Sequence, residues 1–158
     1  MIRQQKSYTL SEAMTKLEGY CSYQERCHKE VRTKLWEMRM IPEAIDHIVT
    51  HLIKMDFLNE ERYARAFVRG KHRIKKWGRK RIVSELKQRN ISIFNIKIAM
   101  TEIDDDRYLA TFNALSEKRV SQIKEQNLQK KRKKLADYLL YRGWESHLVY
   151  DKVKELLG

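Results

Sequence analysis

The chain has 158 residues, enough to bury the core of about one domain and too few for a two-domain enzyme. Five glycines and one proline supply few tight turns, which argues against a β-sandwich or a loop-rich fold. The 34 Lys and Arg residues against 21 Asp and Glu residues give a net charge of +13, which indicates a polyanionic partner, most simply nucleic acid.

Apolar residues recur at spacings of three and four almost throughout the chain, which predicts an all-α protein. This apolar pattern occurs three times with the same internal spacing. The aligned positions are Val31, Leu35, Met40, Ile45 and Val49, then Ile82, Leu86, Ile91, Ile96 and Met100, and then Leu135, Leu139, Trp144, Val149 and Val153. Such internal repetition is typical of stacked helical units.

The repeat predicts three tandem units of three helices each. In chain order the helices are expected at residues 9–23, 27–38 and 42–55, then 60–76, 79–89 and 93–103, and then 105–122, 130–142 and 146–157. The corresponding units are residues 9–56, 57–103 and 104–158. Because stacked units pack mainly on their neighbours, we expect an elongated, curved molecule. The stretch 123–134 is poor in apolar residues and is predicted to be a mobile connection.

Polar residues mark the helix ends at equivalent places in the three units. Thr9, Asn59 and Asp104 stand where each unit begins, and each side chain can accept a hydrogen bond from the first turn of a helix. Between the second and third helices of the units lie Arg39, Asn90 and Gly143. Asn and Gly suit a left-handed helix stop, whereas Arg39 is expected to be strained or to change the turn.

Positive charge is concentrated in the second unit. The window from Arg62 to Arg89 holds twelve Lys and Arg residues and one acid, Glu85. A row of cations on one helix face can bind the phosphates of a polynucleotide, although such a face is also typical of plain solvent exposure. The near-absence of acids favours binding. The residues predicted to contact DNA or an acidic protein surface are Arg62, Arg65, Arg69, Lys71, Arg73, Lys75, Lys76, Trp77, Arg79, Lys80 and Arg81.

Trp77 allows two interpretations. It lies between Lys76 and Gly78 at the end of the basic helix, where a nucleotide base could stack on its ring. The alternative is that the ring packs into the core. Trp144 aligns with the apolar positions Met40 and Ile91 and is therefore predicted to be a core residue.

The sequence contains no recognisable catalytic or metal-binding motif. Its glycines never fall in a phosphate-binding loop pattern, which argues against an ATPase. His47 and His51 lack the Glu of a zinc-protease helix, and the acids at 104–106 are expected at a helix start. We therefore expect no enzyme activity, no cofactor and no metal. Two cysteines and no long apolar run predict a cytoplasmic protein without a membrane segment.

The block from Phe57 to Lys71, followed by Trp77-Gly78, resembles the central motif of the RecX family, which modulates the recombinase RecA. The segments 30–35 and 139–144 are similar to the family's flanking patterns, and the resemblance covers about residues 9–157. The chain departs from the family's usual residues at Cys27, Arg39, Lys76, Arg79 and Asn90. The changes at 76 and 79 leave the turn around Trp77 unpredicted.

The resemblance implies a regulator that binds the RecA filament on single-stranded DNA. Such a protein would contact several RecA protomers and inhibit ATP hydrolysis, strand exchange and co-protease activity in DNA repair. The expected partners are the RecA recombinase filament and the single-stranded DNA within it, and the expected state is a monomer. The alternative function is a stand-alone, non-specific nucleic-acid-binding protein, such as a nucleoid or transcription factor.

Overall fold

The structure is a computed structural model that describes residues 6–158, and within this range the chain forms nine helices and no strand. The helices of the first trio are α1 (Leu10–Tyr23), α2 (His28–Glu37) and α3 (Pro42–Lys54). Those of the second are α4 (Glu60–Arg73), α5 (Arg79–Gln88) and α6 (Ile93–Met100). The third consists of α7 (Asp105–Gln122), α8 (Leu128–Tyr141) and α9 (Ser146–Leu157).

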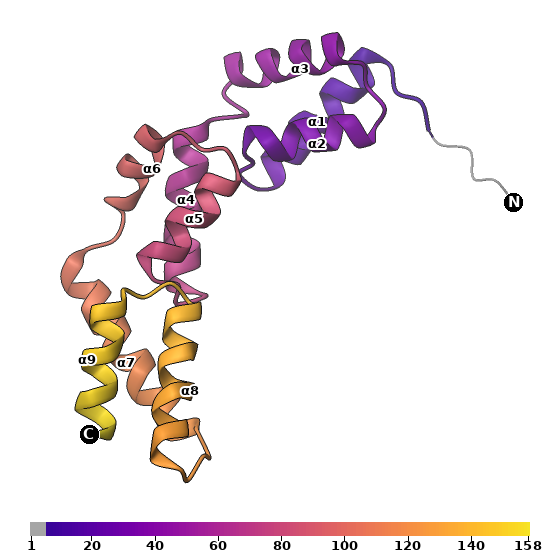
Figure 1. Ribbon diagram of the computed structural model, residues 1–158. Coiled ribbons are helices and arrows are strands. Elements are labelled where there is room, and N and C mark those ends of the chain that lie inside the picture. The colour runs from indigo at the N-terminus through magenta and orange to yellow at the C-terminus, as the bar shows by residue number, and fades with distance from the viewer. Residues whose placement is uncertain (1–5) are drawn as a thin grey trace, which may run out of the picture.

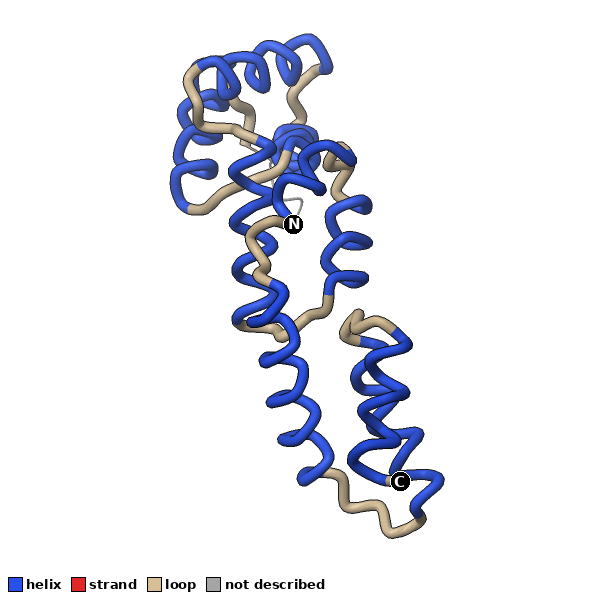
Figure 2. Tube along the Cα trace, turned by 90° about the vertical axis from the view of Figure 1, so that its left-hand side faces the viewer, coloured by secondary structure: helices blue, strands red, loops and turns tan. Residues whose placement is uncertain are grey.

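The three trios follow one another along a bowed molecule (Figure 1). Every helix pair that packs extensively belongs to one trio, such as α4 with α6 and α8 with α9. A view turned by 90° shows the same extended arrangement from the side (Figure 2). The predicted all-α fold of three tandem three-helix units is therefore confirmed. We refer to the trios as the first, second and third units.

The predicted caps at the start of each unit are present. The side chains of Thr9, Asn59 and Asp104 accept hydrogen bonds from the backbone N–H three residues later, at 3.1, 2.9 and 3.1 Å. Each bond satisfies a helix N–H group that has no partner within its own helix. These caps fix where the first helix of each unit begins.

Left-handed residues stop the second helix of each unit, as the repeat predicts. Arg39, Asn90 and Gly143 have φ angles of 61°, 60° and 89°. Arg39 thus adopts the conformation that glycine prefers, at a cost of roughly 1–2 kcal/mol for a residue with a Cβ. Lys76 has the same conformation, with φ of 57°, and lies in the turn that the sequence left unpredicted.

The repeated apolar positions form the core. Thirteen of the fifteen aligned residues are buried, and Met40 and Met100 are half-buried. The buried residues form two clusters. One lies in the first unit and includes Leu58, and the other is shared by the second and third units and includes Cys27. Trp144, with 1% of its surface exposed, lies in the shared core, as predicted. The second and third units therefore form one packed body.

Three predicted segments differ from the structure, and the first is α6, which ends at Met100 rather than at residue 103. Helix α4 ends at Arg73 rather than at residue 76, so Lys76 does not lie on its basic face. Helix α8 begins at Leu128, so the second half of the predicted mobile connection 123–134 is helical. The reason is a cap that the apolar pattern cannot reveal, since the Asn127 side chain accepts a hydrogen bond from the Lys130 N–H.

Candidate nucleic-acid interface

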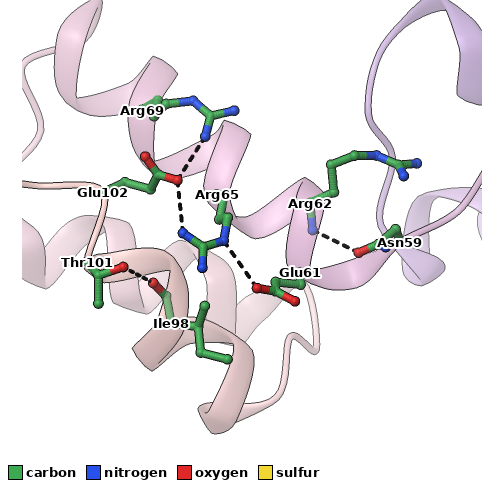
Figure 3. A network of polar contacts seen from close by, with 8 residues as sticks. All are labelled: Asn59, Glu61, Arg62, Arg65, Arg69, Ile98, Thr101 and Glu102. Atoms are coloured by element: carbon green, nitrogen blue, oxygen red, sulfur yellow. Dashed lines mark hydrogen bonds and ion pairs between the residues drawn. The ribbon is translucent and has the colours of Figure 1, made fainter.

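The arginines along α4 have acidic partners from other parts of the chain. Arg62 pairs with Glu25 at 2.6 Å and with Asp56 at 3.1 Å. Arg65 and Arg69 both contact Oε1 of Glu102 at 3.0 Å, in the polar network that Figure 3 shows. These three arginines are therefore ion-paired within the protein, and their predicted contact with DNA or an acidic protein surface stays a prediction.

The charge count along the sequence missed these acids because they lie outside the basic window. Glu25 follows α1, and Glu102 follows α6, which packs on α4. The hydrogen bond from Arg65, together with the charge of Arg69, lowers the pKa of the Glu102 carboxyl below its ordinary value. Glu102 is thus a carboxylate at neutral pH and offsets part of the positive charge of α4.

Arg79 links the second and third units. Its guanidinium pairs with Asp105 and lies 4.0 Å from the ring centroid of Tyr108. Its backbone N–H donates to the Tyr108 hydroxyl, which in turn donates to Glu145. These contacts give Arg79 a structural role where the start of α5 meets the third unit, a contact region that we call the joint. This role is in addition to the binding role that the sequence predicts.

Six of the predicted cations form no ion pair within residues 6–158. They surround the turn between α4 and α5, and we call them the basic corner: Lys71, Arg73, Lys75, Lys76, Lys80 and Arg81. Arg73, Lys75, Lys76 and Lys80 are exposed to solvent. Because like charges repel in the free protein, a polyanion that neutralises them gains affinity, and the gain increases at low salt.

The turn that carries the basic corner is held by backbone bonds to the third unit. The Gly78 N–H donates to the Arg142 carbonyl oxygen at 2.8 Å, and the Lys80 N–H donates to that of Gly143 at 3.1 Å. The indole N–H of Trp144 donates to the Lys76 carbonyl oxygen at 3.1 Å. The basic corner is therefore supported by both units of the packed body.

Glycine is required at this joint. A Cβ on Gly78 would lie 2.4 Å from the Gly143 carbonyl oxygen, and one on Gly143 would lie 2.3 Å from the Arg81 backbone nitrogen. Real Cβ atoms do not approach backbone atoms so closely. The two units can approach this closely only because both residues lack a Cβ.

Trp77 agrees in part with each of the two interpretations that the sequence allows. The residue is half-buried and packs against the shared core, with its ring centroid 6.3 Å from that of Phe67. Two cations lie over the ring, with the Lys71 Nζ at 5.0 Å and the Arg81 Cζ at 4.1 Å from its centroid. Core packing is thus present, and base stacking on this ring stays a prediction.

Tyr141 lies beside the basic corner, and the sequence did not single it out. It is the last residue of α8, and the Arg81 guanidinium carbon lies 4.7 Å from its ring centroid. It lies between Leu139 and Trp144 of the repeated apolar pattern but is not itself a repeated position, and no charge run marks it as part of a binding surface. Only the pairing of the α8 end with the start of α5 brings the tyrosine to the cations.

His51 and Asp104, which the sequence analysis considered for metal binding, have other contacts in the structure. Within residues 6–158 no group of three His, Cys, Asp or Glu side chains is arranged to hold a metal ion. His51 faces Glu18 at 3.5 Å, and Asp104 caps α7. Both cysteines are free and buried.

None of the helices within residues 6–158 combines the length and the apolar character that a membrane-spanning segment needs.

These features define a tandem helical-repeat protein that presents a cationic surface from its middle unit. Family models of RecX match two of the three units, with the second three-helix domain at residues 59–100 and the third at residues 105–153. The chain belongs to the RecX family.

Relatives with known names agree with this assignment. The chain is 29% identical over 137 residues to the regulatory protein RecX of Clostridium acetobutylicum, covering 84% of this chain and 63% of the relative. It is 28% identical over 145 residues to that of Prosthecochloris aestuarii, covering 92% and 93%. The crystal structure of RecX from Lactobacillus salivarius is similar with a TM-score of 0.76 and 26% identity, over 93% of this chain and 96% of that chain.

The chain is shorter than several of these relatives. It spans 36% of the Lactobacillus johnsonii protein and 49% of the Enterococcus faecalis protein. A second solved RecX structure, of which 73% is covered, has a TM-score of 0.81 at 23% identity and supports the fold alone.

Proposed function

We propose that this protein binds the RecA filament on single-stranded DNA and inhibits RecA ATP hydrolysis, strand exchange and co-protease activity. Membership of the RecX family gives the class of regulator, and the names of the relatives point to RecA. The observation that carries the proposal is the basic corner, where exposed cations form no ion pair within residues 6–158. Each phosphate that they neutralise releases counterions, which favours binding to a polyanion.

The bowed shape supports binding to a filament rather than to a small ligand. The trios follow one another along the molecule, so its surface can contact successive subunits of a helical assembly (Figure 1). The shared core of the second and third units makes a packed body that can hold the basic corner in place. In this proposal the protein acts as a monomer in the cytoplasm, without catalysis and without a cofactor.

The test compares a RecA filament with naked single-stranded DNA as the ligand. We expect tighter binding to the preformed filament at physiological salt, and a dose-dependent fall of the DNA-dependent ATPase of RecA. Equal binding to naked DNA with unchanged RecA ATPase would contradict the proposal and favour a stand-alone nucleic-acid-binding protein. Inhibition that disappears when DNA is added in excess over RecA would contradict it too, since the protein would then act only by occupying DNA.

A further inference from the structure

Tyr141 is a large aromatic side chain that the fold leaves in solvent. The residue is 72% exposed, although it ends a helix that buries Leu135, Ala136 and Leu139. Burying a tyrosine ring removes a large apolar area from water, so an exposed ring beside a binding surface is a candidate contact. Exposure alone does not distinguish Tyr141 from Tyr150, which is 57% exposed on α9.

The surroundings of Tyr141 do make that distinction. The Arg81 guanidinium lies over two rings, with its carbon 4.1 Å from the Trp77 centroid and 4.7 Å from the Tyr141 centroid. Tyr141 thereby continues a series of aromatic rings and cations that leads from the basic corner to the third unit. Tyr150 has no cation over its ring among the contacts of residues 6–158.

The backbone at Tyr141 is held beside the basic corner by bonds between α5 and the end of α8. Arg81 donates to the Tyr141 carbonyl oxygen at 3.3 Å, and the Gly78 N–H donates to that of the next residue, Arg142, at 2.8 Å. The left-handed Gly143 then packs against the Arg81 backbone. Because the backbone at Tyr141 is already fixed, only the side-chain torsions have to be ordered when a ligand stacks on the ring.

We propose that Tyr141 is a stacking platform for an unpaired base of single-stranded nucleic acid, whose phosphates bind the basic corner. An aromatic ring next to cations suits this ligand because stacking needs a free base, whereas duplex bases are covered by their neighbours. Trp77 is less suited, since it is half-buried and carries both Lys71 and Arg81 over its ring. This inference deepens the proposed function by naming a contact to the DNA. It rests on that function only for the statement that the bound strand is the single-stranded DNA of a RecA filament.

The experiment separates stacking from charge with two probes. The first is a fluorescently labelled oligothymidylate, and the second is an abasic oligomer with the same number of phosphates. Binding of the whole protein to each probe is measured by fluorescence anisotropy at one salt concentration. Tyr141→Ala removes the ring, Tyr141→Phe retains it, and Tyr150→Ala removes a control ring from the same unit.

We expect the wild-type protein to bind oligothymidylate more tightly than the abasic oligomer. Tyr141→Ala should weaken binding of oligothymidylate by at least about fivefold and leave binding of the abasic oligomer unchanged, because base stacking is a sizeable contribution per base. Tyr141→Phe and Tyr150→Ala should bind both probes as the wild-type protein does. The circular dichroism spectrum of each variant should match that of the wild type.

Three results would overturn the inference. One is equal wild-type affinity for the two probes, and another is normal oligothymidylate binding by Tyr141→Ala. The third is an equal loss on both probes, which would indicate damage to the basic corner rather than loss of stacking. None of these measurements contains RecA, so they can fail while RecA inhibition is observed, and the inference can hold if RecA inhibition is absent.

Discussion

The contact between Gly78 and Gly143 predicts a large effect for a small substitution. Gly78→Ala would place a Cβ 2.4 Å from the Gly143 carbonyl oxygen and 2.6 Å from the Trp144 nitrogen. Neither atom belongs to a flexible side chain, so the backbones of the two units must separate. Overpacking of this kind costs about 1–3 kcal/mol. The separation also weakens the hydrogen bonds from Gly78 and Lys80 to the third unit, at about 1 kcal/mol each.

A total of about 3–5 kcal/mol is a large share of the stability of a domain, which is about 5–15 kcal/mol. We expect the melting temperature of Gly78→Ala to fall by about 6–20 °C, measured by circular dichroism. Gly19→Ala is the matched control, because Gly19 lies within α1 and a Cβ there would meet nothing within 4 Å. That substitution should stabilise the protein by about 0.5–1 kcal/mol. A melting temperature of Gly78→Ala at or above that of the wild type would refute the backbone contact at the joint.

Three further predictions concern other parts of the chain. Arg39→Gly should stabilise the protein by about 1 kcal/mol in urea unfolding, because glycine adopts φ of 61° without strain; a lowered midpoint would contradict this. The hydrogen bond from Arg65 lowers the pKa of Glu102 below its ordinary value of 4.5. The ionised carboxylate therefore stabilises the fold above pH 4.5, and this stabilisation is lost as the pH falls below 4.5. Unfolding of Glu102→Gln should accordingly depend less on pH than that of the wild type below pH 4.5, and equal dependence would argue against the network. Burial raises the pKa of the Cys21 thiol to about 11, so a thiol reagent should modify it only as slowly as the protein unfolds, whereas immediate reaction would place it at the surface.

The sequence was sufficient to predict the repeating fold. Apolar spacing determined the helix trios because the core positions recur with the same offsets, and the caps at Thr9, Asn59 and Asp104 followed from residue type. The end of α4 was harder to predict. The left-handed lysine at position 76 lies in the turn after the helix, and this turn bonds to the third unit through the Trp144 indole, which is a tertiary contact that the local sequence does not show.

The candidate site could be predicted only in part. The excess of charge in the second unit is visible in the sequence, and so are the i,i+4 pairs of Arg65 with Glu61 and of Arg89 with Glu85. The pairs with Glu25 and Glu102 are not visible there, since these acids come from elements distant in sequence. Folding therefore divides the basic residues into ion-paired arginines on α4 and the basic corner, which forms no ion pair within residues 6–158. Tyr141 was not predicted as part of the site from its local sequence. The fold places it beside the basic corner, where Arg81 lies over its ring.

The most direct test of the basic corner is the DNA-dependent ATPase of RecA titrated with two charge-reversed proteins. Arg73→Glu combined with Lys75→Glu reverses two exposed residues of the basic corner without breaking an ion pair in the described chain. Lys54→Glu combined with Lys97→Glu changes the net charge equally, at the last turns of α3 and α6. We predict that the first protein loses inhibition of RecA while the second inhibits as the wild type does. Equal inhibition by both proteins would contradict the role of the basic corner.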